Sequence, residues 1–173
     1  MVYETRKNDN REEKTSFLIV DSQSVKNTDT AKHKGYDGGK KISGIKRHIG
    51  VDTNGLPHMI HVTTANITDR NGAIEGFSLC LEHLSCVKKV LADAIYTGDN
   101  FANAVKHLLN AVVEIAKRSE LHKFVVIPKR WIVERSFAWL EKCRRLWKNC
   151  ERDLNSSQNM VVLAFLAVLL RRF

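Results

Sequence analysis

Hydrophobic residues in this chain gather in short runs, each about as long as a β-strand. The run "SFLIVDSQS" (residues 16–24) is compact and predicts a buried strand. "KRHIGVD" (46–52) and "LPHMIHVTTA" (56–65) are joined by "TNG", and Asn-Gly between two β-rich runs predicts a hairpin. "VKKVLADAIY" (87–96) and "AVVEIAKR" (111–118) predict two further strands, which makes five in total.

Helical patterns alternate with these strands and close the chain. We expect helices over residues 69–85, 100–110, 129–149 and 156–173, and a loop rich in Gly and Lys over 28–45. In the third helix one apolar stripe should pack on the sheet, formed by Val133, Phe137, Leu140 and Trp147. A hairpin followed by alternating strands and helices predicts an α/β fold, with a mixed five-stranded sheet flanked by helices.

Composition indicates one basic domain. The 173 residues are enough to bury a core. Lys and Arg total 28 against 19 Asp and Glu, a net charge of +9, which favours a polyanionic partner, nucleic acid before a membrane. We expect residues 1–15 to be a loosely ordered polar extension and residues 16–173 to be the folded domain. The apolar run near the C-terminus is shorter than the roughly 20 residues of a membrane span, so no membrane partner is expected.

Three carboxylates stand out against this basic background. Asp21 and Asp93 each finish a predicted apolar strand, where a carboxylate is costly to bury unless it is paired or binds a cation. A strand-end cap or a salt bridge explains each one singly, whereas two such strands side by side would bring the acids together and demand a divalent ion. Glu134 lies beside the packing face of its helix, and an ion pair with Arg130 or Lys142 is the competing explanation.

Two further aspartates are weaker candidates. Asp52 precedes the predicted hairpin turn, and Asp69 stands at the start of the first predicted helix. A turn role for Asp52 and a helix N-cap role for Asp69 are sufficient explanations.

Four blocks of the sequence together resemble the DDE transposases of bacterial insertion sequences. They are "LIVDSQSVKNTDTAKHKGYDGGKKISGIKRHIGVDTNG", "VTTANITDRNGA", "VLADAIYTGDNF" and "WIVERSFAWLEKCRRLWKNCER". The resemblance is closest to the group whose glutamate helix reads like "VERSFAWL", and it runs from about residue 17 to the C-terminus. It implies an RNase H-like fold, with Asp21, Asp93 and Glu134 as the catalytic and metal-binding triad. Of the basic and aromatic positions around the family glutamate, Arg130 matches, whereas Ile127 replaces a Tyr and Glu141 replaces a Lys.

The resemblance also implies the chemistry and the partners. The triad would hold Mg²⁺, with Mn²⁺ as a substitute, for hydrolysis at transposon ends and then attack of the freed 3′-hydroxyl on target DNA. Copies would assemble in a transposition complex, in a bacterial cytoplasm and at the nucleoid when bound to DNA. The side chains expected to hold DNA are Lys40, Lys41, Lys46, Arg47, Arg130, Arg135, Lys142, Arg144, Arg145 and Lys148.

The stretch before Asp21 is too short for the helical DNA-recognition region that relatives of this kind carry. Two explanations fit: the chain works together with the product of an upstream reading frame, or it is a truncated remnant. A catalytically silent DNA-binding or regulatory protein is therefore the alternative to an active transposase.

Overall fold

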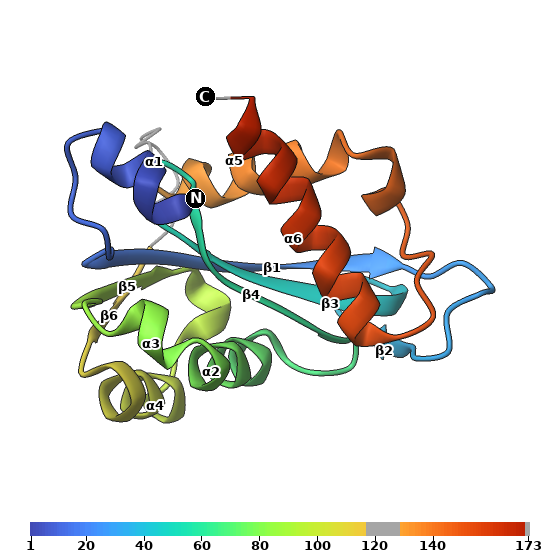
Figure 1. Ribbon diagram of the computed structural model, residues 1–173. Coiled ribbons are helices and arrows are strands. Elements are labelled where there is room, and N and C mark those ends of the chain that lie inside the picture. Colours follow the sequence, from blue (N-terminus) through green and yellow to red (C-terminus); the bar gives the residue numbers. More distant parts are fainter. Residues whose placement is uncertain (117–128, 172–173) are drawn as a thin grey trace, which may run out of the picture.

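The structure is a computed structural model that describes residues 1–116 and 129–171 (Figure 1). Its strands are β1 (Phe17–Lys26), β2 (Gly35–Asp37), β3 (Ile42–Val51), β4 (Pro57–Thr64), β5 (Lys89–Ala92) and β6 (Val112–Ile115). Its helices are α1 (Val2–Asn8), α2 (Asp69–Leu79), α3 (Leu81–Leu84), α4 (Asp99–Leu109), α5 (Arg130–Glu141) and α6 (Leu154–Leu170), with the 3₁₀ turns η1 (Ala94–Tyr96) and η2 (Arg144–Leu146).

β1 is the strand around which the mixed sheet is built. It pairs antiparallel with β3 and parallel with β5, which in turn pairs parallel with β6. β3 and β4 form the predicted hairpin, and Gly55 in its turn has a φ of +80°, a conformation that glycine adopts at little cost. The described sheet has a sixth strand because β2, inside the expected loop, pairs with the start of β3.

β1 does not end at Asp21, as the apolar run predicts, but continues to Lys26. Every residue from Asp21 to Lys26 is paired with a residue of β3. Ser22 and Ser24 are buried within it, so small polar side chains rather than apolar ones continue the strand. The prediction failed because a strand held by an antiparallel partner does not need an apolar sequence.

Helices cover both faces of the sheet, and β1 contributes to both cores (Figure 1). Leu18 and Val20 belong to the core shared with α2 and α4, whereas Ile19 and Val25 belong to the core shared with α5 and α6. Successive side chains on a strand point to opposite faces. Asp21 has the parity of Ile19 and therefore lies on the α5 side.

The N-terminal residues are ordered, contrary to the expectation of a loose extension. Residues 2–8 form α1, in which Thr5 and Arg6 are buried. The Arg6 guanidinium forms a buried ion pair with the carboxylate of Asp52, in the β3–β4 turn. Short polar segments look disordered in a sequence when the partner that orders them lies far along the chain.

α5 is shorter than the predicted helix, and this changes which side chains are buried. The helix ends at Glu141, and at Cys143 the backbone is extended before η2 begins. Val133, Phe137 and Leu140 pack in the core as predicted, but Leu146 takes the place expected for Trp147. Trp147 is 75% exposed, so the prediction that it packs on the sheet is wrong.

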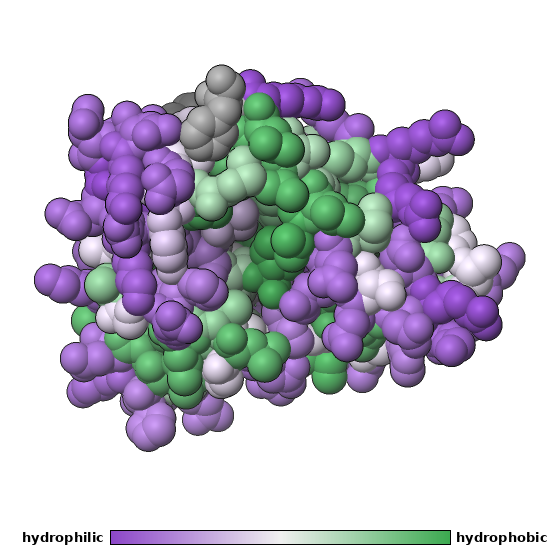
Figure 2. All heavy atoms as spheres, in the orientation of Figure 1, coloured by the Kyte–Doolittle hydropathy of each residue, from purple (hydrophilic) through white to green (hydrophobic). Residues whose placement is uncertain are grey.

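α6 is apolar around most of its circumference. Val161 and Phe165 are in the core, while Val162, Leu163 and Leu170 are exposed. Figure 2 shows hydrophobic side chains gathered over this part of the molecule, between two polar regions. In residues 1–116 and 129–171, no helix combines the length and the apolar character that crossing a bilayer requires.

Candidate active site

Asp21 and Asp93 lie where the parallel pairing of β1 and β5 ends. The last paired residues are Ile19 and Leu91, and each aspartate stands two positions beyond its strand's last paired residue. Asp93 also caps η1 and accepts the N–H of Ile95 at 3.0 Å. Because parallel strands advance together, the two carboxylates come to the same edge of the sheet.

Electrostatics also link the two aspartates. Burial raises the pKa of Asp21 from 3.8 to about 6, and the charge of Asp93 adds to the rise. The N–H of Ser22, which donates to Asp21 Oδ1 at 2.7 Å, and the charges of Lys40 and Arg130 oppose it. At neutral pH the carboxylate of Asp21 is therefore incompletely compensated, and a cation beside it would be stabilised.

Arg130 connects the aspartate pair to Glu134. Arg130 Nη2 lies 3.9 Å from Asp93 Oδ2, and Arg130 Nε lies 3.3 Å from Glu134 Oε1. The intrahelical pair that competes as an explanation for Glu134 is thus present, but its guanidinium also reaches the end of β5. Glu134 is 55% exposed, at the start of the helix that covers β1.

The residues present fit a hard divalent cation in part. Carboxylate oxygens are the ligands that Mg²⁺ prefers, and one or two of them suffice when water and phosphate complete the site. The Arg130 guanidinium shows that a cation is accommodated between Asp93 and Glu134. However, no three His, Cys, Asp or Glu side chains in the described part of the chain are arranged to hold one ion. Convergence of Asp21, Asp93 and Glu134 on a common ion stays a prediction.

The sequence profile of the family described as "Transposase DDE domain" matches residues 12–170. This chain belongs to the transposase DDE domain family. A putative transposase for insertion sequence element IS402 of Burkholderia cepacia is 34% identical over 116 residues, which are 63% of this chain and 54% of that protein. The transposase domain thus spans about half the length of this curated relative. Transposases of this family act on DNA and generally depend on divalent metal ions.

Solved structures agree with the fold that the resemblance implies. A chain of the simian T-cell lymphotropic virus intasome, solved with the PP2A regulatory subunit B56 gamma, matches with a TM-score of 0.56 and 16% identity, over 88% of the transposase domain and 47% of that chain. The catalytic core domain of BIV integrase matches with a TM-score of 0.53 and 12% identity, over 88% of this chain and 82% of that one. The RNase H-like fold is confirmed.

Most of the cations predicted to hold DNA are accessible. Six of them are exposed: Lys40, Lys41, Lys142, Arg144, Arg145 and Lys148. Arg145 pairs with Glu151 at 3.0 Å, at a surface where such pairs are weak. Arg135 is partly buried between Trp131 and Trp139, with its guanidinium carbon 4.6 and 4.8 Å from the two ring centres, and donates to the carbonyl of Asn54. This contact with the hairpin gives Arg135 a structural role.

Lys46 and Arg47 are buried, 5% and 2% exposed, so the prediction that they contact DNA is wrong. Lys46 Nζ lies 2.7 Å from Asp69 Oδ1 and 3.2 Å from Asp37 Oδ2. Arg47 Nη2 donates to the carbonyl of Leu146 at 2.8 Å. β3 is covered on both faces, so its basic residues turn inward to internal partners. Asp69 serves as such a partner, while the N-cap of α2 is Thr68.

Sequence reasoning missed a cavity of about 400 Å³ that lies along the second half of β1, beyond Asp21. Its lining includes Gln23, Glu141, Trp147 and Lys148. Gln23 is two residues beyond Asp21 on the same face of β1, and its Nε2 donates to Glu141 Oε1 at 2.8 Å. Glu141, which stands where the family has a Lys, is therefore bound to Gln23 inside the domain. Ile127 lies outside the described residues.

The sequence did contain a signal for this cavity, since Trp147 stands among the cations Arg144, Arg145 and Lys148.

Proposed function

We propose that this domain hydrolyses DNA at transposon ends and then joins the freed 3′-hydroxyl to target DNA. Asp21, Asp93 and Glu134 serve as the catalytic carboxylates. The observation that supports this most is the meeting of Asp21 and Asp93 at the end of the β1–β5 pairing, with Glu134 linked to them through Arg130, in a transposase DDE domain. Recognition of the ends, assembly of copies and any contribution of an upstream-frame product belong to the same proposal, as does the assignment of residues 16–173 as the catalytic domain.

Asp21 and Asp93 would hold Mg²⁺, or Mn²⁺ in its place, and Glu134 would complete the ligand set. When bound, the metal activates the attacking oxygen and stabilises the charge that develops on the phosphate and the leaving oxygen. Asp21 is ionised above pH 6 and is then free to bind a cation. Arg130 has to leave at least one of its acidic partners as Glu134 turns inward. Its guanidinium then faces the scissile phosphate, for which its planar fork is well suited.

The DNA strand runs from the acids past the cavity lined by Trp147. Exposed cations at Lys40, Arg144, Arg145 and Lys148 would neutralise its phosphates. The exposed Trp147 ring, with Lys148 Nζ 5.7 Å from its centre, gives an unpaired base a surface on which to stack.

Neutralising the 144–148 cluster is expected to weaken DNA binding in a salt-dependent way. The triple variant Arg144→Gln, Arg145→Gln, Lys148→Gln should lower the slope of log K against log salt by up to about 3, since each phosphate contact contributes about 0.9. A salt titration of DNA binding by fluorescence anisotropy measures the slope. The control changes three remote exposed lysines to Gln, at Lys7, Lys88 and Lys106, for the same loss of net charge. Equal slopes for both variants would exclude a local DNA contact.

The function is tested by incubating the domain with supercoiled plasmid and Mg²⁺, Mn²⁺ or EDTA. Nicking that depends on the metal and leaves 3′-hydroxyl ends is the expected result. Salt-sensitive binding without nicking under any metal would instead support the catalytically silent DNA-binding protein. Binding alone does not separate the two, because the same basic surface serves both.

A further inference from the structure

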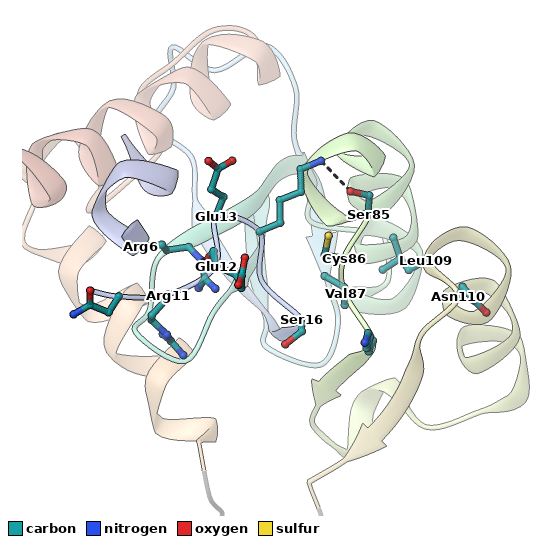
Figure 3. A pocket seen from close by; sticks show the side chains of 13 residues that line it. Arg6, Arg11, Glu12, Glu13, Ser16, Ser85, Cys86, Val87, Leu109 and Asn110 are labelled. Carbon is teal, nitrogen blue, oxygen red and sulfur yellow. Dashed lines mark hydrogen bonds between the residues drawn. The ribbon is translucent and has the colours of Figure 1, made fainter. Parts of the chain in front are cut away.

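The N-terminal segment, residues 1–12, contacts the β3–β4 turn through three pairs of side chains. Arg6 ion-pairs with Asp52 and donates from Nε to the carbonyl of Glu12 at 2.7 Å. Arg11 donates to the hydroxyl of Thr53, and Asn54 donates to Asp9 Oδ2 at 2.9 Å. Figure 3 shows Arg6, Arg11 and Glu12 on this segment, at the edge of a cavity of about 980 Å³. The segment therefore holds the tip of the hairpin rather than its strands.

Asp52 determines the shape of that turn. Its Oδ1 accepts the backbone N–H groups of Asn54 at 2.8 Å and Leu56 at 3.0 Å. Its Oδ2 faces Arg6 and, at 3.4 Å, His58 Nε2. A fully buried carboxylate needs these partners to be tolerated. The cation of Arg6 and the fold of the turn are thus coupled through one side chain.

The β3–β4 turn contacts α5 at the two residues that follow Glu134. Arg135 Nη2 donates to the carbonyl of Asn54 at 3.1 Å, and the Ser136 hydroxyl shares its proton between the carbonyl of Gly55 at 3.3 Å and that of Ile132, within α5, at 3.0 Å. A Cβ on Gly55 would lie 2.9 Å from Ser136 Oγ and 3.1 Å from the Trp139 ring, so turn and helix are in close contact. Arg135 and Ser136 are the two residues that follow Glu134.

Apolar packing alone leaves the orientation of α5 weakly defined. Ile132, Val133 and Phe137 hold the helix on the sheet, but hydrophobic attraction has no direction. Hydrogen bonds have angular requirements, and those from α5 to the turn act within half a helical turn of Glu134. The position of the turn therefore sets the direction in which Glu134 points.

We propose that Arg6 and Asp52 are positioning residues for Glu134. Docking of α1 fixes the turn, the turn fixes the first half of α5, and α5 fixes the distance between Glu134 and the aspartate pair. A displacement of the N-terminal segment would thus reach the acids without any change in the sheet. The inference rests on the proposed function, since that function gives Glu134 its role.

The double variant Arg6→Met, Asp52→Asn tests this, because it removes both charges of the ion pair together, so that neither is left buried without the other. Hydrogen exchange should quicken about tenfold in the amides of α5, while α4 keeps its rates, because the loosening is local. Plasmid nicking at saturating metal and DNA should slow by about 100-fold, the cost of a displacement near 1 Å, with DNA affinity unchanged. Arg6→Lys alone, with Asp52 unchanged, keeps a cation beside that carboxylate and should therefore show smaller losses than the double variant in both measurements.

Lys7→Met is the matched control, since Lys7 lies on the same helix and, among the residues that the structure describes, pairs only with the exposed Glu4 and Glu13. It should match the wild type in both measurements. If the double variant does not fold, Ser136→Ala carries the same exchange test from the other end of the contacts. Unchanged exchange in α5, or equal loosening of α4 and α5, would overturn the proposal. A wild type that never nicks would refute the proposed function, and the exchange rates would still decide whether Arg6 and Asp52 position α5.

Discussion

Changing Asp21 to Asn is expected to abolish metal-dependent nicking and, at the same time, to make the protein more stable. Loss of a carboxylate that binds the metal should lower the cleavage rate by at least about 1,000-fold, given the several kcal/mol that a metal contributes to such a reaction. The rise of the Asp21 pKa from 3.8 to about 6 means that folding disfavours the charged form by at most about 3 kcal/mol. Asn carries no charge and escapes this cost.

The gain in stability should depend on pH in a defined direction. A carboxyl group whose pKa is higher in the folded state stabilises the protein fully below pH 4, and this contribution is lost as the pH rises through about 6. Asp21→Asn should therefore unfold at a higher urea concentration than the wild type at pH 7.5 in EDTA, and the difference should vanish near pH 3.5. Glu134→Gln is the comparison, because Glu134 is largely exposed and should lose nicking without this stabilisation. Equal midpoints for Asp21→Asn and wild type at pH 7.5 would contradict the argument.

Changing Lys46 to Met should destabilise the fold strongly. Its Nζ lies between the carboxylates of Asp69 and Asp37, and all three side chains are largely buried. Removing the Lys46 ammonium leaves two buried carboxylates without their nearest positive charge, which should lower the free energy of unfolding by about 3–5 kcal/mol. Urea denaturation at pH 7.5 measures the loss. DNA affinity, measured well below the unfolding transition, should stay within twofold of the wild type.

Lys41→Met is expected to lower DNA affinity and to leave stability nearly unchanged, the opposite of Lys46→Met. Lys41 is exposed, so its removal should change the free energy of unfolding by less than about 0.5 kcal/mol while lowering DNA affinity. A Lys46→Met protein that folds normally but binds DNA poorly would mean that Lys46 reaches the DNA. The pair of variants thus separates a cation inside the fold from a cation on its surface.

The fold was predictable where the signals are local. Asn54-Gly55 between two β-rich runs predicts the β3–β4 hairpin, because a glycine there relieves the backbone at a positive φ. Val133, Phe137 and Leu140 predict the buried face of α5 by their spacing. The same spacing failed at Trp147, since a helix wheel assumes that the helix continues and α5 ends at Glu141.

The position of Asp21 and Asp93 beside each other could be predicted from the sequence, whereas the contacts around them could not. Asp21 and Asp93 are recognisable because each follows an apolar strand core, and parallel pairing of those strands brings them to one edge. Arg130 was expected to hold DNA, but here it pairs with Asp93 and Glu134. Both readings fit one sequence because an arginine binds a phosphate or a carboxylate with the same donors.

By itself the sequence determined five of the six described strands in their order, the hairpin and the family, and it proposed the three carboxylates, since periodicity, turn chemistry and motifs are properties of neighbouring residues. Only the tertiary structure decided that Lys46 and Arg47 point inward, that Arg6 orders the N-terminal segment, and that the turn at Asp52 contacts α5 beside Glu134. A charged side chain is buried or exposed according to partners that lie far away along the chain. Those partners meet only when the sheet has formed and both of its faces are covered.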